Sequence, residues 1–171
     1  MKKRKNIITV AIDSPAAAGA GTQAKLISDH YKLFYLDTGK IYRYIGFLKL
    51  KNHRKFSYNF IRKKIKNLRL NYLQNKQLLS NEVALSASKI ATDKKIRAIV
   101  HKFQQKCAYS PPIKYSGSVL DGRDITSIQM RDAMFKFYIT ANVNVRAQRR
   151  YRTLNQWQAS ARVHRNFQLI G

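Results

Sequence analysis

Short apolar runs alternate along this chain with longer segments in which apolar residues recur at helical spacing. The first run, Ile7-Ile-Thr-Val-Ala-Ile12, is rich in β-branched residues and ends at a turn of small residues, as a strand buried in a parallel sheet does. Strands that alternate with helices indicate crossover connections and a sheet covered on both faces. The pattern therefore predicts an α/β domain, with further strands at residues 32–35, 118–120 and 135–140, and with helices from Thr22 onward and at residues 39–50, 86–105 and 144–154.

The alternation lapses between residues 47 and 79, where the composition becomes strongly basic. A basic amphipathic helix is predicted there, because the apolar residues share one helical stripe while the lysines and arginines face elsewhere; the stripe consists of Tyr58, Ile61, Ile65 and Leu68. A stripe that faces the core is the ordinary interpretation, and a membrane or RNA surface is the alternative. Residues 68–72 and 77–79, joined through Asn75, are expected to form a small hairpin inserted between units of the main sheet.

The charge of the chain is far from neutral, since 34 Lys and Arg stand against 8 Asp and Glu and leave a net charge of +26 in 171 residues. Such a surface attracts polyanions, whether nucleic acid, nucleotide phosphates or an anionic membrane. The hydrophobic fraction of 44% is enough for a core, which excludes a wholly disordered chain. We therefore expect a single domain over residues 1–171.

Other features exclude several classes of site and location. The lone Cys107 rules out an intramolecular disulfide framework and a multi-cysteine zinc site, and the four scattered histidines show no metal-ligand spacing. Asp13 interrupts the N-terminal apolar run after about six residues, where a secretory signal needs more. No run approaches the ~18 apolar residues of a membrane span. These features predict a soluble cytoplasmic protein that binds no membrane.

A stretch of small residues, Ser14-Pro-Ala-Ala-Ala-Gly-Ala-Gly-Thr22, directly follows the first strand and opens the first helix. Backbone N–H groups of a tight loop and the positive end of the helix dipole together make an anion site at this position, and the Thr22 hydroxyl is free to reach a phosphate-bound Mg²⁺. The usual phosphate-binding pattern has a first glycine and a lysine, which Ser14 and Ala20 replace here. On the loop alone, a plain small-residue turn is the alternative.

Several motifs follow one another in a defined order. They are Ile12-Asp-Ser-Pro-Ala-Ala-Ala-Gly-Ala-Gly-Thr22, Tyr35-Leu-Asp-Thr-Gly39 with Ile41-Tyr-Arg43, Glu82-Val83 with Ala87-Ser-Lys-Ile-Ala91 and Ile96-Arg97, Leu120-Asp-Gly-Arg-Asp-Ile125, Ala133 with Lys136-Phe137, and Thr140-Ala141 with Val145-Arg-Ala147 and Arg149-Arg150. In order and spacing they resemble the bacterial cytidylate (CMP) kinase family over about residues 7–154. The first helix is also similar to that of adenylate kinase, so adenylate or uridylate specificity is the nearest alternative.

The resemblance implies a P-loop nucleoside monophosphate kinase that converts ATP and CMP or dCMP to ADP and CDP or dCDP with Mg²⁺. The implied fold is a parallel sheet flanked by helices, with core segments at residues 6–46 and 80–154 and a short NMP-binding insert at residues 47–79. The resemblance assigns the ATP phosphates to a loop made of Ser14, Pro15, Ala16, Ala17, Ala18, Gly19, Ala20, Gly21 and Thr22, with Thr22 also the metal ligand. It assigns the CMP pocket to Thr38, Arg43, Ser88, Arg97, Asp121, Arg123 and Asp124, and catalysis to Arg123, Arg149 and Arg150.

This mixture of side chains suits the implied substrate, because arginines can grip a phosphate in bidentate fashion while Ser and Asp can read a cytosine edge or ribose hydroxyls. Taken singly, the same residues have plainer explanations, which are a helix N-cap at residues 37–39, solvated helix faces at Arg97 and Arg149-Arg150, and a salt-bridged turn at residues 121–124. Of the eight acidic residues, six nevertheless fall within the motifs: Asp13, Asp37, Glu82, Asp121, Asp124 and Asp132.

Three departures from the family pattern bear on activity. Ser14 and Ala20 alter the phosphate loop, and removing one preorganised charge typically costs on the order of 10²–10³ in rate. The insert is short. The family continues beyond the position of Gly171, so residues 155–171 are expected to be an incomplete lid and C-terminal end, with lower stability or association.

A monomer whose partners are ATP and CMP or dCMP is expected, with impaired activity. The alternative is a catalytically decayed relative, which binds nucleotides or nucleic acid through non-specific charge and loses affinity steeply with salt.

Overall fold

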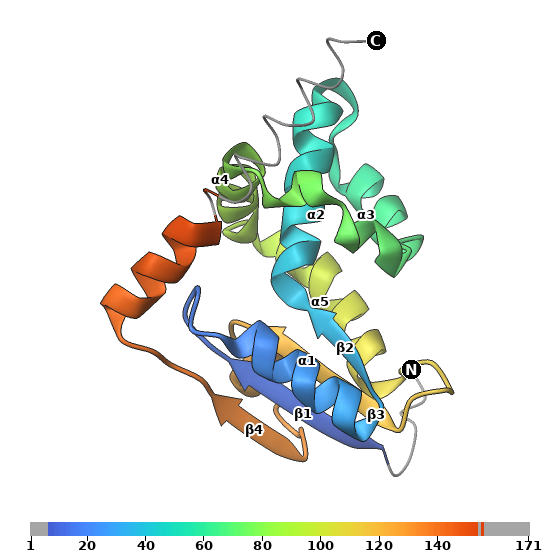
Figure 1. The fold of residues 1–171 in the computed structure, drawn as a ribbon. Helices are drawn as coiled ribbons and strands as arrows, with labels where there is room; N and C mark the ends of the chain where they lie inside the picture. Colours follow the sequence, from blue (N-terminus) through green and yellow to red (C-terminus); the bar gives the residue numbers. More distant parts are fainter. Residues whose placement is uncertain (1–6, 154, 156–171) are drawn as a thin grey trace, which may run out of the picture.

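The computed structural model describes residues 7–153 and residue 155. At the centre of this described part lies a sheet of four parallel strands in the order β2-β3-β1-β4 (Figure 1). The strands are β1 (Ile8–Asp13), β2 (Leu33–Asp37), β3 (Gly117–Gly122) and β4 (Phe135–Tyr138). Asp121 of β3 lies opposite both Ile12 of β1 and Asp37 of β2, so the three strands end together. The residues that follow them therefore meet at one edge of the sheet.

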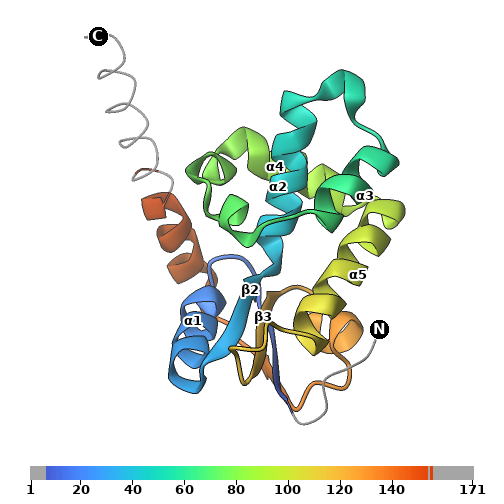
Figure 2. The ribbon, with the colours of Figure 1, turned by 90° about the vertical axis from the view of Figure 1, so that its right-hand side faces the viewer.

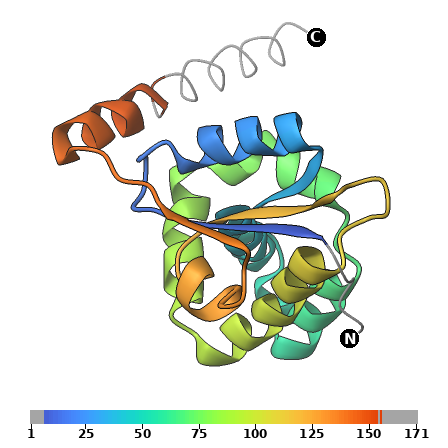
Figure 3. The ribbon, with the colours of Figure 1, turned by 90° about the horizontal axis from the view of Figure 1, so that it is seen from below.

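Helices cover both faces of the sheet (Figure 3). Successive residues of a strand point to opposite faces, so Val10 and Ile12 of β1 pack in one buried cluster with Ala24 of α1 (Ala20–Tyr31). Ala11 of the same strand belongs to the other buried cluster, which includes Val100 of α5 (Lys94–Tyr109). The parallel sheet between helices confirms the predicted α/β fold.

Helices α2 (Thr38–Lys51), α3 (Tyr58–Lys66) and α4 (Asn81–Ala91) gather beyond the end of the sheet (Figure 2). The close contact between α2 and α4 requires a glycine, because a Cβ on Gly46 would lie 2.9 Å from the backbone nitrogen of Ala87. Helix α2 begins directly after β2, where the side chain of Asp37 accepts a hydrogen bond from Lys40 N at 3.2 Å. The N-cap predicted at residues 37–39 is thus confirmed.

The predicted amphipathic helix is α3, whose Ile61 and Ile65 are buried while its lysines are exposed. The hairpin predicted at residues 68–79 is wrong. Two short 3-10 helices stand there instead, η2 (Leu70–Gln74) and η3 (Lys76–Leu79), after a third short one at His53–Lys55 (η1). The Asn75 side chain accepts a hydrogen bond from Gln77 N at 2.9 Å, so it caps a new helical turn. Leu73 and Leu78, one on each of these short helices, are buried.

The single long helix predicted at residues 86–105 is also wrong, because the structure has two helices there. Helix α4 starts at a Ser80 N-cap and ends at Ala91, and α5 starts after Asp93. The Asp93 carboxylate accepts hydrogen bonds from Lys95 N at 2.8 Å and Ile96 N at 3.0 Å, which makes it the N-cap of a new helix. The break lets the two helices follow different directions around the same core.

After β3 a π-helical turn, η4 (Ile125–Gln129), leads to β4, whose four residues are all exposed at the edge of the sheet. Residues 143–153 are helical, which agrees with the predicted helix as far as it is described. The incomplete lid predicted at residues 155–171 lies outside the described residues apart from Asn155. None of the helices in the described part is long and apolar enough to cross a membrane.

Candidate active site

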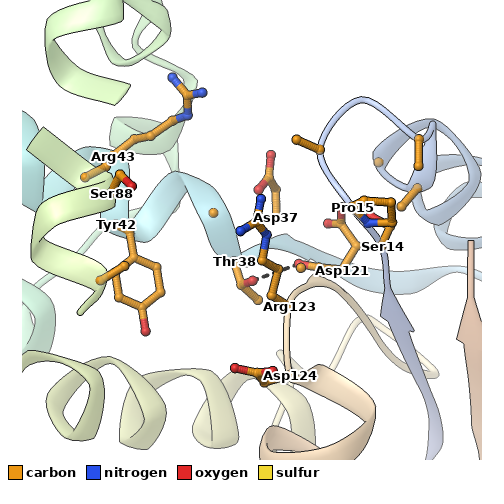
Figure 4. Close-up of a pocket in the computed structure, with 18 of the residues that line it drawn as sticks. Ser14, Pro15, Asp37, Thr38, Tyr42, Arg43, Ser88, Asp121, Arg123 and Asp124 are labelled. Atoms are coloured by element: carbon orange, nitrogen blue, oxygen red, sulfur yellow. Dashed lines mark hydrogen bonds between the residues drawn. The ribbon is translucent and has the colours of Figure 1, made fainter. Parts of the chain in front are cut away.

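A cavity of about 750 Å³ opens at the edge of the sheet where β1, β2 and β3 end (Figure 4). It brings together three segments that are far apart in the sequence: the loop after β1, the start of α2, and the turn after β3. Helices α4 and α5 close its other side. Most of the sequence-predicted site residues line it, namely residues 14–21, Thr38, Arg43, Ser88, Arg97, Asp121, Arg123 and Asp124.

The loop after β1 wraps one end of this cavity. Its first residue is tied to the turn after β3, because Ser14 N donates to Gly122 O at 3.1 Å. Two residues turn the chain by adopting positive φ, Ala17 at 60° and Gly19 at 101°, and Gly19 is the N-cap of α1. The left-handed region suits glycine, whereas Ala17 pays a steric cost there. The loop thus presents the N-terminus of α1 to the cavity, as an anion site requires.

Two of the predicted loop residues differ from the others. Ala20 lines the cavity, but it is only 3% exposed and packs in the cluster between β1 and α1. Thr22 is exposed, but it is not among the residues that line the cavity. Loop residues 14–21 include no basic residue, so the loop itself contributes no positive side chain to the cavity.

The end of β3 places a buried carboxylate in the cavity wall. Asp121 is 8% exposed, and its Oδ1 has no hydrogen-bond partner among the described residues. The Tyr35 hydroxyl donates to the carboxylate, and Thr38 Oγ1 donates to Asp121 O at 2.8 Å. Burial, and then the negative charge of Asp37, raise the pKa of Asp121 to about 7. The same burial and the charge of Asp121 raise the pKa of Tyr35, so its hydroxyl stays protonated.

This raised pKa has a consequence for stability. In the unfolded chain Asp121 titrates near its ordinary pKa of about 4, so between about pH 4 and 7 the native state binds the extra proton and the free energy of unfolding falls as pH rises. We expect Asp121→Asn, which carries no charge, to gain stability relative to the unchanged protein between pH 5 and pH 8. Urea unfolding at both pH values measures this, and an equal difference at both would contradict it.

The far end of the cavity is lined by a polar stripe of α5 that faces η4. Arg97 Nη2 lies 3.0 Å from Asp124 Oδ2, so the turn after β3 is salt-bridged to α5, and both side chains are partly exposed. One turn later, the His101 ring hydrogen-bonds to Gln129. Another turn on, Gln104 is 2% exposed and its Oε1 has no partner among the described residues.

Sequence reasoning missed some lining residues, of which Asp37, Tyr42, Gln104 and Gln129 carry polar groups. Tyr42 adjoins Arg43 inside a recognised motif. Gln104 lies seven residues after Arg97, two helical turns along the same face of α5, which is a signal that the sequence contained. Gln129 could not have been found in this way, because a π-helical turn brings it to the cavity.

Three arginines flank the loop around a second cavity of about 460 Å³. Arg43 Nη1 donates to Leu78 O at 2.8 Å, and burial together with the positive charge of Arg150 lowers the pKa of Arg43. Arg149 Nη1 donates to Ala18 O at 3.0 Å, with a longer bond of 3.4 Å to Ala17 O. Arg149 and Arg150 line this second cavity and not the first. The geometry thus offers a positively charged flank beside the loop.

Comparison with known proteins agrees with this arrangement. The sequence model of the cytidylate kinase family matches residues 10–170. The chain is 43% identical to the cytidylate kinase of Bartonella tribocorum over 160 residues, which cover 91% of this chain and 71% of that protein. It is 41% identical to the cytidylate kinase of Bartonella bacilliformis, over 87% of this chain and 68% of that protein. It is 36% identical to the cytidylate kinase of Mesorhizobium japonicum, over 85% of this chain and 66% of that protein. The chain therefore belongs to the cytidylate kinase family.

Proposed function

We propose that this protein is a nucleoside monophosphate kinase that transfers the γ-phosphoryl group of ATP to CMP or dCMP. An oxygen of the monophosphate attacks the γ-phosphorus, the bond from that phosphorus to the β–γ bridging oxygen breaks, and ADP leaves as CDP or dCDP forms. The observation that carries the proposal is a single cavity in which the loop at residues 14–21 faces the arginines and aspartates of the α5–β3 region. Donor and acceptor sites of a phosphoryl transfer need this proximity.

The phosphates of ATP are assigned to the loop. Its backbone N–H groups and the positive end of α1 favour an anion without any charged side chain. The monophosphate of the acceptor is assigned to Arg43 and Arg123. The cytosine base of the acceptor is assigned to Ser88, Arg97 and Asp124. Thr38 is assigned a supporting role in the cavity wall, because it bonds to Asp121 O.

Mg²⁺ is the expected companion of ATP. It takes oxygen ligands, and it is usually held by one or two carboxylates together with substrate phosphates and water. No group of three or more His, Cys, Asp or Glu that could hold a metal occurs in the described part of the chain. The orphaned carboxylate of Asp121 nevertheless fits, because its Oδ2 would lie 3.6 Å from a Cβ added to Gly21 at the start of α1. Asp121 would hold the ion together with Thr22, which directly follows Gly21 on α1, and the ion would neutralise phosphate charge.

A coupled assay of ADP formation tests the function. Two purified full-length proteins are compared, the unchanged protein and the Ala20→Lys variant. Each is supplied with ATP and Mg²⁺ and with one of the four acceptors CMP, dCMP, UMP and AMP. We expect slow turnover that prefers CMP and rises in the variant, because phosphoryl transfer depends on positioning and charge neutralisation. If neither protein forms ADP with any of the four acceptors, the kinase proposal is wrong.

The loop without a lysine also favours a second candidate, in which the protein binds nucleotides or nucleic acid without useful turnover. Its 34 basic residues would then form a positively charged surface that attracts polyanions without specificity. Affinity for a generic RNA would fall steeply between low and physiological salt as counterions are released. An affinity that hardly changes with salt, or measurable CMP turnover, decides against this candidate.

A further inference from the structure

The phosphate loop of this protein has no cation of its own. Position 20, where the phosphate-binding pattern has lysine, is a buried alanine. The next basic residue of α1 is Lys25, and its ammonium is paired with Asp29 one turn farther along the helix. Lys25 is thus held on the exposed side of α1, away from the loop, and it does not replace the missing charge.

A cation reaches the loop from a distant part of the sequence. The helical segment at residues 143–153 lies beside the loop (Figure 1). From this segment, Arg149 Nη1 donates to Ala18 O at 3.0 Å and to Ala17 O at 3.4 Å. A Cβ added to Gly19 would lie only 3.4 Å from the same nitrogen. The guanidinium is therefore fixed along residues 17–19, immediately before position 20.

The surroundings of this guanidinium favour an anion. Ala16, Ala17 and Gly19 line the second cavity together with Arg43, Arg149, Arg150 and Thr153, and no acidic residue is among them. Arg43 and Arg150 already repel each other, since the charge of Arg150 contributes to the lowered pKa of Arg43. A polyphosphate beside the loop would relieve this repulsion.

Arg149 is distinguished from the other two arginines by its contact. The one hydrogen bond described for the Arg43 side chain goes to Leu78 O at 2.8 Å, on η3 and away from the loop. Within the described part of the chain, no hydrogen bond joins Arg150 to the loop, whereas both bonds of Arg149 end on it. The guanidinium has five N–H groups, so others remain for phosphate oxygens.

We infer that Arg149 supplies to the ATP phosphates the positive charge that a lysine at position 20 would supply, so that the loop's cation comes from the helix at residues 143–153. This inference rests on the proposed function. It has a quantitative consequence, because two cations that serve the same phosphates are partly redundant. Arg149 should matter greatly in the unchanged chain and much less once position 20 carries a lysine.

The test is a double-mutant cycle with the full chain: unchanged protein, Ala20→Lys, Arg149→Met, and both together. Binding of ATP with Mg²⁺ is measured by calorimetry in the absence of an acceptor, and turnover of CMP is measured separately. We expect Arg149→Met to weaken ATP binding roughly 10-fold or more in the unchanged chain and about 3-fold or less in the Ala20→Lys background. Arg152→Met is the control, since it removes the same charge from an exposed position of the same helix.

Each outcome decides the matter. An equal loss in both backgrounds, or an equal loss with Arg152→Met, overturns the inference, and so does ATP binding that appears only with Ala20→Lys. ATP binding that depends on Arg149 without any phosphoryl transfer supports the inference and overturns the proposed function. If none of the proteins binds ATP, both are wrong.

Discussion

Arg123→Met is expected to lower the turnover of CMP on the order of 10²–10³-fold, with little change in the free energy of unfolding. Arg123 is exposed in the turn after β3, and Figure 4 shows its side chain near Asp37 and Thr38, in the middle of the cavity. No hydrogen bond or ion pair joins the Arg123 side chain to the rest of the described chain, so folding gains little from it. Its planar guanidinium is instead available to a phosphate, with which it can form two parallel hydrogen bonds.

The measurements are the coupled assay and urea unfolding, each repeated with Arg131→Met. Arg131 is an exposed arginine eight positions later that bonds to Ser127 O at 2.6 Å and does not line the cavity. The control removes the same charge from the same region, so a general electrostatic effect would lower turnover in both variants. Unchanged turnover in Arg123→Met would remove Arg123 from the proposed site. Arg123→Lys should recover only part of the loss, because an ammonium cannot form the bidentate contact.

The second large effect is expected from Gly122→Ala, which should destabilise the fold by about 2–4 kcal/mol and abolish turnover. A Cβ at position 122 would lie 2.0 Å from Thr38 Oγ1 and 3.3 Å from Ile125 Cδ1. Thr38 is 3% exposed and cannot move into solvent, so either its bond to Asp121 O breaks or β3 and α2 separate. Because the same contact aligns the start of α2 with the turn after β3, stability and activity should fall together.

Urea unfolding measures the loss, and Gly39→Ala is the matched control. A Cβ on Gly39 would lie 3.3 Å from Asp37 Oδ1, a contact that a shift of a few tenths of an ångström relieves, and alanine favours the helix there. Gly39→Ala should therefore change stability by about 1 kcal/mol or less. Equal midpoints for Gly122→Ala and the unchanged protein would show that the close approach of Thr38 is not needed.

The strand and helix pattern could be predicted wherever one physical signal dominates. A buried β-branched run is visible at residues 7–12 because both faces of a parallel strand are covered, and the apolar stripe of α3 is visible because only one face is. The errors lie where local capping competes with periodicity. Asn75 and Asp93 each accept hydrogen bonds from backbone N–H groups with their side chains, and each so begins a new helix. For this reason a 3-10 helix stands where a hairpin was predicted, and two helices stand where one long helix was predicted.

The site was predicted from motifs, and most of the residues named in this way line one cavity. Thr22 does not, because the first turn of α1 carries it to the exposed side. Gln129 was missed because its position depends on a π-helical turn that leaves no periodic signal.

The sequence by itself determined the class of fold, the position of the phosphate loop and the absence of a lysine from it, since these follow from local pattern and residue identity. Only the tertiary structure decided how the charges are placed. It paired Lys25 with Asp29, buried Asp121 near Asp37, and docked Arg149 on Ala18 of the loop, 131 positions away in the chain. Electrostatic energies depend on distance and burial, and neither quantity is set by spacing along a sequence.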